Sequence, residues 1–297
     1  MALALCGCGG GRGVAGSPAS AAPLLVNAGA DEALAAGVIA DRARGADVVY
    51  LGEQHDNPTH HSHQRAVVEA LVARGVRPAL AFEMLEESQQ ADVDRAVAGG
   101  LTAEDLDERL RWRARGWPDL GMYQPLFEIA AREKLPVIAL DLDPAVSRRI
   151  AREGLGSLGS RAEGLASRLP ADTAREDAIA GVIREGHCGL LPEARLPTIV
   201  DAWHARNVTM ARRLAAGLDR GLTVVVIVGR GHQAAGGLPA QLAALRPGTR
   251  QLVVDMIEAP PGTRRDAAVG AAAGDVVWLT PAVERGDPCA GLRRAPR

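Results

Sequence analysis

The chain is poor in aromatic residues and in lysine, and it has no long apolar run. Aromatic residues make up 3% of its 297 residues, and Lys134 is the only lysine. A stretch of about 18 apolar residues, the minimum for a transmembrane helix, does not occur. The net charge is −2 and there is no basic tail, so nothing in the charge pattern points to nucleic acid as a partner.

Cysteine is also scarce, and its spacing limits what it can do. The four cysteines are Cys6, Cys8, Cys188 and Cys289. Neither a CxxC motif nor a zinc-finger spacing occurs among them, which argues against a cysteine-based metal site. Cys188 and Cys289 lie far apart in the sequence. They could pair in an oxidising compartment, and the sequence alone leaves this open.

The first residues read MALALCGCGGG. Leu5 to Cys8 has the Leu-x-Gly-Cys form of a bacterial lipoprotein cleavage site, and either Cys8 or Cys6 would become the lipid-bearing first residue. A complete secretory signal has a charged segment followed by about 7 to 15 apolar residues, and only its end is recognisable here. We therefore predict a truncated lipoprotein signal and a flexible tether over residues 1–23, and a lipid-anchored protein on the periplasmic side of a bacterial membrane.

Apolar segments of strand length alternate with helical patterns along the rest of the chain. Hydrophobic residues make up 47% and charged residues 24%, the ordinary globular range, so a sizeable core is available. The predicted strands are residues 47–51, 78–84, 136–140, 223–228, 251–257 and 275–279. Strands that alternate with helices predict an α/β fold with a mostly parallel central sheet and helices on both faces.

We expect these strands to form a single α/β domain over residues 24–285. Two helical insertions are predicted, at about 86–115 and 144–218. The second contains no strand pattern, and we interpret it as a helical cap over the carboxyl edge of the sheet. The tail from Arg285 onward is polar and is expected to be loose, with residues 286–297 lying outside the domain.

The densest polar cluster follows the first core strand, in the stretch VVYLGEQHDNPTHHSH, residues 48–63. Asn57 is a good helix cap and Pro58 a good first helical residue, so the stretch predicts a strand, a turn and a helix. Ligands of a parallel sheet bind at the carboxyl ends of its strands, where this turn would lie. Its ionisable side chains are Glu53, His55, Asp56, His60, His61 and His63.

A second turn repeats the form of the first. The segments 52–55 and 229–232 both read Gly-x-x-His, and each follows an apolar strand. If both strands are central and parallel, their histidines face one cleft. Glu53 follows the strand 47–51, and Glu83 lies at the end of the next predicted strand, 78–84, so both carboxylates would join the histidines at this edge. The residues predicted to share this edge are Glu53, His55, Glu83 and His232.

Two histidines and two carboxylates allow several kinds of chemistry. They can hold a divalent metal, for which His55, Glu83 and His232 are the candidates. They can act as general acid and base, with Glu53 as a further catalytic residue. They can also form the polar floor of a cofactor site, or simply satisfy strand ends and cap helices. The nucleophile motif Gly-x-Ser-x-Gly is absent, and the dinucleotide fingerprint is not in its usual place at the first strand.

A loop rich in glycine and proline carries two of the scarce aromatic residues. It runs from residue 115 to 125 and contains Trp117 and Tyr123. An aromatic side chain in such a loop either plugs the edge of the core or stacks on a ligand.

Five segments together resemble the ChaN family of bacterial haem-binding uptake lipoproteins, part of a superfamily that includes Tiki, TraB and the erythromycin esterases. They are GEQHDNPTHH, the strand ending FEM followed by Gln89, the loop GWPDLGMYQP, the stretch RNVTMA and the ending GRGHQAAGGLP. The resemblance covers residues 48–257. It implies an α/β fold with a helical cap, a periplasmic lipoprotein, and a homodimer that holds haem between its subunits. It also implies that a tyrosine, assisted by a histidine, ligates the iron.

Tyr123 matches the family's tyrosine. The residues assigned to the haem site on this resemblance are Tyr123, His60, His61 and Trp117. The polar site of the superfamily maps onto Glu53, His55, Glu83 and His232, which are catalytic or metal-binding in its enzymatic branches. We therefore expect a haem-binding protein of haem or iron uptake. The alternative is a hydrolase or metal-dependent enzyme, of esterase or peptidase type, at the paired Gly-x-x-His site. A binding protein is favoured over an enzyme.

Overall fold

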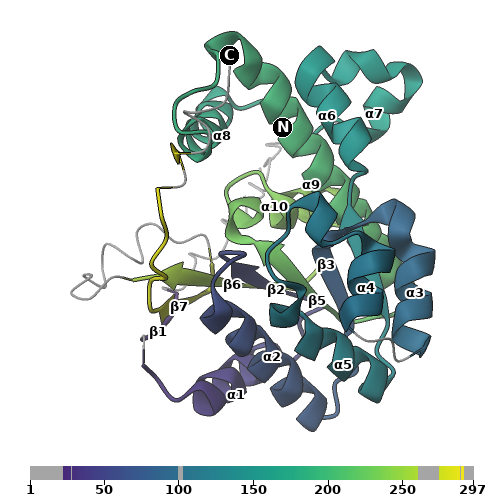
Figure 1. Cartoon of the computed structure of the whole chain (residues 1–297), viewed down its shortest axis with the longest axis vertical. Helices are drawn as coiled ribbons and strands as arrows, with labels where there is room; N and C mark the ends of the chain where they lie inside the picture. The colour runs from purple at the N-terminus through teal and green to yellow at the C-terminus, as the bar shows by residue number, and fades with distance from the viewer. Residues whose placement is uncertain (1–22, 28, 100–102, 260–273, 288, 291–297) are drawn as a thin grey trace, which may run out of the picture.

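The computed structural model describes residues 23–27, 29–99, 103–259, 274–287 and 289–290 (Figure 1). Within them the chain forms a single seven-stranded sheet in which all neighbouring strands are parallel. The strands are β1 (Leu24–Val26), β2 (Val48–Glu53), β3 (Ala79–Glu86), β4 (Val137–Asp141), β5 (Val224–Gly229), β6 (Gln251–Glu258) and β7 (Val276–Thr280). Their order across the sheet is β1-β7-β6-β2-β5-β3-β4. The predicted α/β fold with a parallel sheet is confirmed.

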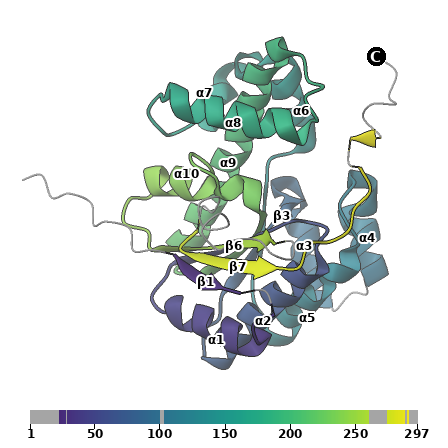
Figure 2. The ribbon, with the colours of Figure 1, turned by 90° about the vertical axis from the view of Figure 1, so that its left-hand side faces the viewer.

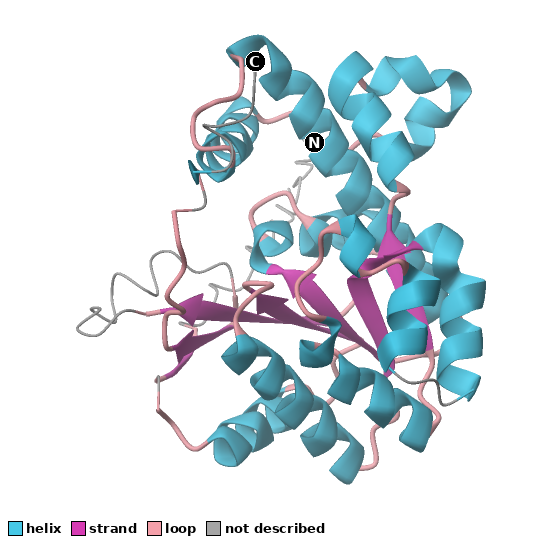
Figure 3. Cartoon of the chain, viewed as in Figure 1, coloured by secondary structure: helices cyan, strands magenta, loops and turns pink. Residues whose placement is uncertain are grey.

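Helices cover both faces of this sheet (Figure 3). They are α1 (Glu32–Arg42), α2 (Pro58–Ala73), α3 (Gln90–Gly99), α4 (Ala103–Leu110), α5 (Gln124–Glu133), α6 (Pro144–Glu153), α7 (Ala162–Leu165), α8 (Thr173–Gly186), α9 (Leu196–Asp219) and α10 (Leu238–Leu245). Short 3₁₀ helices lie between them at Glu87–Gln89, Arg113–Arg115, Leu120–Met122, Leu155–Arg161, Glu193–Arg195 and Arg230–Gln233. In the described part of the chain, no helix combines the length and the apolar character needed to cross a bilayer.

The strand alternation divides the core between the two faces. Val49 and Leu51 of β2 point to the layer formed by α1, α2 and α5, whereas Val48 and Tyr50 point to α9 and α10. Figure 2 shows these two layers on opposite sides of the sheet. The central strands are therefore apolar on both sides, which explains why they read as continuous apolar runs.

The helical cap is built from α6, α7 and α8, which lie beyond α9 from the sheet (Figure 2). It has a small apolar core of its own, formed by Leu142, Ile150, Leu165, Ala202 and Ala205. The predicted insertion 144–218 is therefore only partly a cap, because α9 runs from the cap down onto the sheet and packs Met210 and Leu214 against it.

Two parts of the chain differ from the prediction. The segment 24–26, placed next to the expected tether, forms the edge strand β1 beside β7. The tail was expected to be loose, yet Arg285 and Cys289 both bind other parts of the chain. The strand 24–26, Arg285 and Cys289 each pair with residues that lie far away in the sequence, and local composition does not reveal such partners. Residues 1–22, with the predicted signal and lipid-bearing cysteines, lie outside the described residues.

Candidate functional site

The two Gly-x-x-His turns meet at the carboxyl edge of the sheet, because β2 and β5 are neighbours. Their register pairs Glu53 with Gly229. After β2 the chain turns and enters α2, where the Asn57 side chain accepts a hydrogen bond from the backbone N–H of Thr59 at 2.9 Å. Pro58 is the first helical residue. The predicted strand, cap and helix start are confirmed.

The first glycine of each motif makes room for a side chain of the opposite turn. A Cβ atom on Gly229 would lie 2.7 Å from Nε2 of His55 and 3.2 Å from a carboxylate oxygen of Glu83. A Cβ atom on Gly52 would collide with the side-chain amide of Gln233. Both glycines have ordinary strand conformations, so it is this close approach that requires glycine. The paired motif is thus the sequence signature of two interlocked turns.

Glu53 is buried and surrounded by hydrogen-bond donors. One carboxylate oxygen accepts a bond from Nδ1 of His55 at 2.7 Å and another from the hydroxyl of Tyr123 at 2.6 Å. The other oxygen accepts a bond from the amide of Gln64 at 2.5 Å, and Nδ1 of His61 lies 3.4 Å from it. Burial works to raise the pKa of Glu53, but these donors and the nearby histidines outweigh it and lower that pKa.

Glu83 is the second buried carboxylate of the site. It accepts hydrogen bonds from the backbone N–H of Gly229 at 2.7 Å and from the guanidinium of Arg206 at 2.8 Å. Nε2 of His232 lies 3.2 Å from the same oxygen that binds Arg206. Although burial opposes ionisation, the charges of His232, His55 and Arg206 hold the pKa of Glu83 well below its usual value.

Arg206 and Asp141 extend this network to the end of β4. The guanidinium binds the Asp141 carboxylate through two parallel contacts, Nε to Oδ1 at 2.9 Å and Nη2 to Oδ2 at 2.7 Å. It therefore bridges Asp141 and Glu83, and these two carboxylates raise its pKa despite its burial. Such a fork is the geometry that arginine supplies and lysine does not.

His55 is the member of the cluster that reaches solvent. Its side chain is 30% exposed, whereas those of Glu53, Glu83 and His232 are almost fully covered. Nε2 of His55 lies 3.9 Å from Glu83, on the side opposite its hydrogen bond to Glu53. Desolvation lowers the pKa of His55, but the charges of Glu83 and Glu53 outweigh it and raise that pKa to about 9. At neutral pH, His55 is therefore a cation that can donate a proton.

His232 is held from the cap side. Its Nδ1 lies 3.0 Å from the side-chain oxygen of Asn207, and the amide of Asn207 donates to the backbone of Trp203. The ring of Trp203 lies parallel to that of His232 at 6.0 Å. Both ring nitrogens of His232 thus face oxygen acceptors, one from α9 and one from Glu83.

The cluster brings together Glu53, His55, Glu83 and His232, as the strand order predicted. The arrangement does not favour a metal. In the part of the chain that the structure describes, no group of three or more His, Cys, Asp or Glu side chains is arranged to hold a metal ion. The guanidinium of Arg206 contacts Glu83 where a metal shared with the histidines would need that carboxylate. The predicted metal set His55, Glu83 and His232 therefore lacks structural support.

Three of the four residues predicted to bind haem, Tyr123, His60 and His61, are buried in this structure. Tyr123 is fully buried, and burial together with the charge of Glu53 raises the pKa of its phenol far above the usual value. His60 is also buried, with its ring between the backbone N–H of Gln54 and the hydroxyl of Thr280, and burial lowers its pKa to about 4. Among the predicted haem residues, only Trp117 reaches the surface.

Both ring nitrogens of His61 are also taken up by hydrogen-bond partners within the protein. Its Nε2 lies 2.9 Å from the backbone oxygen of His55, and its Nδ1 lies 3.1 Å from the side-chain oxygen of Gln64. The ring also packs at 4.3 Å against that of Tyr123. His61 and Tyr123 thus form a buried support beneath Glu53 and offer no free ligand atom for iron.

Trp117 lies between two surface hollows beside the cluster. Its ring contacts the ring of His55 edge-on at 5.1 Å. The larger hollow, of about 860 Å³, is lined by Trp112, Trp117, Pro118 and Leu120, and its charged residues are Asp107, Glu108, Asp119 and Arg113. The smaller, of about 510 Å³, contains Trp117 with the arginines Arg111, Arg115 and Arg148 and the acidic residues Glu86, Asp141 and Asp143. The aromatic wall suits a flat ligand, and the arginines of the smaller hollow suit carboxylates on that ligand.

Sequence reasoning missed several members of the site. Arg206, Asn207 and Gln64 were not assigned to it, although each binds one of the predicted residues directly, and neither was Asp141, which binds Arg206. The strand-end position of Asp141 was a usable signal. Arg206 and Asn207 lie in the middle of a long helix, where spacing alone does not show which face meets the sheet.

Comparisons with known proteins cover most of the chain. A family model described as haem-binding uptake, Tiki superfamily, ChaN, matches residues 39–242. Solved structures that resemble the chain include ChaN of Campylobacter jejuni, described with cofacial haem binding. That protein is 20% identical, with 76% of this chain and 87% of that chain covered and a TM-score of 0.61. The likeness shows that the two share a fold.

Two other solved structures are more distant. A mutant of the erythromycin esterase EreC in its open conformation is 14% identical, with 74% of this chain and 72% of that chain covered and a TM-score of 0.45. A Bacillus cereus protein is 14% identical, with 80% and 72% covered and a TM-score of 0.47. No curated protein sequence matches the chain.

Proposed function

Because the chain belongs to the family described as haem-binding uptake, Tiki superfamily, ChaN, we propose that it binds haem and takes part in haem or iron uptake. The observation that carries the proposal is the half-buried Trp117, which lies in the matched segment and forms an aromatic wall beside the arginines of the smaller hollow. A porphyrin is flat and apolar, and its propionates are carboxylates. Aromatic stacking and arginine–carboxylate pairing are the contacts that such a ligand needs.

We further propose that the protein acts in the periplasm as a lipid-anchored homodimer with haem between its subunits. The disulfide between Cys188 and Cys289 supports an oxidising compartment. A dimer would cover the second face of a haem whose first face rests on Trp117. Cys8 or Cys6 would carry the lipid.

Titration with haemin tests the haem proposal. We expect a saturable shift of the Soret band at about one haem per chain, with dimer formation in size-exclusion chromatography. Trp117→Ala should weaken binding by about tenfold, since a buried aromatic contact is typical of a binding hot spot. Trp203→Ala is the matched control, because Trp203 is also half-buried but packs beside His232. If the wild-type protein gave no saturable Soret shift, the haem proposal would be abandoned.

A hydrolase remains the second candidate, and one observation favours it. His55 is partly exposed, carries a raised pKa and is clamped between two buried carboxylates. Such an imidazolium can donate a proton to a leaving group and recover one from water, while Glu53 keeps its ring oriented. Because Glu83 is already bound to Arg206 and to the backbone of Gly229, it acts as fixed negative charge beside the imidazolium.

An ester-hydrolysis assay with p-nitrophenyl esters distinguishes the two candidates. If the site is catalytic, His55→Ala and Glu83→Gln should lower the rate by about 10² to 10⁴. The control is His187→Ala, since His187 is exposed and its ring bonds only to the backbone of Ile183. Wild-type protein with no turnover above the His55→Ala background would eliminate the hydrolase and leave haem binding untouched.

A further inference from the structure

The described residues that follow β7 form a strap across the edge of the sheet. Residues 281–287 and 289–290, which we call the C-terminal strap, follow β7 (Figure 1). At its start, the side-chain amide of Asn57 donates to the backbone oxygen of Pro281 at 3.2 Å. The strap thus leaves the sheet beside the residue that caps α2, next to the first Gly-x-x-His turn.

Arg285 fastens the strap to the same turn. Its guanidinium binds the Asp56 carboxylate through Nε at 2.6 Å and Nη2 at 2.7 Å. It also binds the Glu258 carboxylate at the end of β6, through Nη1 at 2.7 Å and Nη2 at 2.6 Å. Asp56 directly follows His55, so the strap is attached to the site itself. The double fork raises the pKa of Arg285 and lowers those of Asp56 and Glu258.

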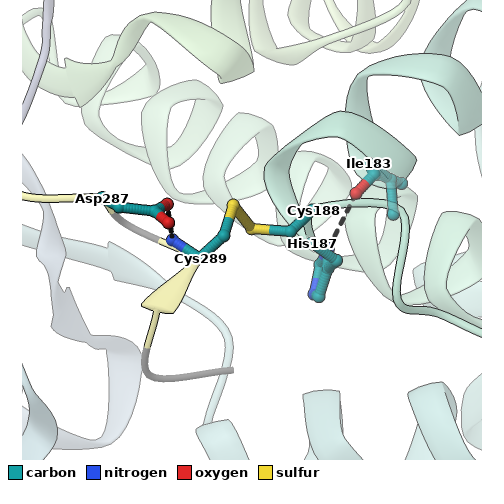
Figure 4. Close-up of a disulfide and its surroundings, with 5 residues drawn as sticks. All are labelled: Ile183, His187, Cys188, Asp287 and Cys289. Atoms are coloured by element: carbon teal, nitrogen blue, oxygen red, sulfur yellow. Dashed lines mark hydrogen bonds between the residues drawn. A yellow bond between two sulfur atoms is a disulfide. The ribbon is translucent and has the colours of Figure 1, made fainter. Parts of the chain in front are cut away.

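The far end of the strap is bonded covalently to the cap. Cys289 forms a disulfide with Cys188, with their Cα atoms 5.8 Å apart (Figure 4). Cys188 lies just after α8, in the turn that ends the helix, and the backbone N–H of Cys289 donates to the side chain of Asp287 at 2.8 Å. The strap therefore joins the end of α8 to the carboxyl edge of the sheet.

Helix α8 has few other attachments. Ile179 is the only residue of α8 that is fully buried, and Val182 is 58% exposed. Its ion pairs with other segments are Glu176 with Nε2 of His204 on α9, at 2.7 Å, and the exposed Arg184 with Glu193, at 2.9 Å through both Nε and Nη2. One buried side chain and ion pairs that are partly exposed hold a helix weakly. The disulfide is thus the covalent attachment of α8 among several weak ones.

The helix covers the second Gly-x-x-His turn. A small apolar pocket of about 80 Å³ lies between them, lined by Ala178, Ile179, Val182, Ile183, Trp203, Gly231, Ala234 and Ala235. Trp203 is the side chain that lies parallel to His232. If α8 moved away, Trp203 and then His232 would be the first groups of the site to gain exposure.

We propose that Cys188–Cys289 is a redox-controlled latch that closes the cap over the His232 side of the site. A dithiol reductant supplies two electrons and two protons, is itself oxidised to a disulfide, and leaves Cys188 and Cys289 as free thiols. Arg285 keeps the strap on the sheet edge, so reduction frees α8 rather than the whole tail. The oxidised chain is closed and the reduced chain gives access to His232.

The test compares the oxidised full chain with the chain reduced by dithiothreitol. A non-reducing peptide map first identifies the Cys188–Cys289 link. We expect amide hydrogen exchange of α8 to quicken by about tenfold on reduction, with no change in α2, because a local attachment is lost without global unfolding. Carbethoxylation by diethyl pyrocarbonate, mapped by mass spectrometry, should rise at His232 and stay low at the buried His60.

The double variant Cys188→Ser with Cys289→Ser is the matched control. It should match the reduced wild type in both measurements and should not respond to the reductant. Exchange of α8 and modification of His232 that do not change on reduction of the wild type would overturn the latch. So would a double variant that still responds to the reductant, or a peptide map without the linked pair. These readouts need neither haem nor a substrate, so they are independent of the proposed function.

Discussion

The hydroxyl of Tyr123 donates a 2.6 Å hydrogen bond to the carboxylate of Glu53, and both residues are fully buried. The same carboxylate oxygen accepts the hydrogen bond from His55. The phenol therefore acts as a neutral donor that helps to keep Glu53 ionised. A tyrosinate ligand for ferric iron would have to lose this proton, and the negative charge of Glu53 opposes that loss.

Tyr123→Phe tests which role the tyrosine has. The substitution leaves a buried carboxylate short of one donor, so the free energy of unfolding should fall by about 1 to 3 kcal/mol. Haem added to the variant should give the same absorption spectrum as it does with the wild type. Chemical denaturation and haemin titration measure the two effects. Loss of a ferric charge-transfer band in the variant would instead make Tyr123 an iron ligand and require the loop 115–125 to rearrange.

Gly229→Ala should disrupt the site through one added methyl group. The new Cβ atom would lie 2.7 Å from Nε2 of His55, so the imidazole has to move away from Glu83. We expect a loss of about 1 to 3 kcal/mol in the free energy of unfolding, together with a lower pKa of His55 in an NMR titration. Gly231→Ala is the control, because nothing lies within 4 Å of a Cβ atom there. Equal effects of the two substitutions would show that the close approach at Gly229 is unimportant.

The sequence was sufficient to predict six of the seven strands and one edge of the site. Continuous apolar strands with glycine and a carboxylate or histidine at their ends gave the positions of Glu53, Glu83 and the two turns. This worked because a parallel sheet brings strand ends together whatever the rest of the chain does. The Asn57 cap was equally local, since a cap depends on the next few residues only.

The features that the sequence did not predict depend on contacts between distant segments of the chain. Arg206 lies 123 residues from Glu83 in the sequence, and no pattern on α9 reveals which carboxylates it meets. The loop aromatic Tyr123 was equally compatible with a core plug and a ligand contact, and only the tertiary packing shows that it is buried. The Cys188–Cys289 pairing was left open for the same reason, because its geometry depends on where the cap and the tail end in space.

The raised pKa of His55 predicts how stability depends on pH. Folding raises this pKa from 6.5 to about 9, so the folded chain binds the proton more tightly than the unfolded chain. The resulting stabilisation is fully present below pH 6.5 and is lost as the pH rises through about 9. Over that window the wild type should lose about 1 to 2 kcal/mol more unfolding free energy than His55→Gln, after allowance for solvent screening. Parallel curves for the two proteins would contradict the ion pairing of His55 with Glu53 and Glu83.

Arg206→Ala should be the most damaging single change in the network. It leaves Asp141 and Glu83 buried without the cation that bridges them, and breaking a buried ion pair costs about 3 to 5 kcal/mol. The pKa of Glu83 should rise toward its unfolded value as well, so the stability lost as the pH falls through the acidic range should be smaller than in the wild type and should level off at a higher pH. Denaturation curves across the acidic range measure both effects.

Two further variants separate the loss of charge from the loss of the fork. Arg206→Lys keeps the positive charge but not the two parallel bonds to Asp141. Its stability should therefore depend on acidic pH much as in the wild type, while its free energy of unfolding stays lower. Arg213→Ala removes a guanidinium from the same helix that binds only the backbone oxygen of Ala139 and the side-chain oxygen of Gln90. Its free energy of unfolding should fall by the worth of ordinary hydrogen bonds, about 1 kcal/mol each. The dependence of its stability on acidic pH should be like that of the wild type. If Arg213→Ala changed this dependence as much as Arg206→Ala does, the effect would reflect general loss of helix packing, and Arg206 would have no special hold on Glu83.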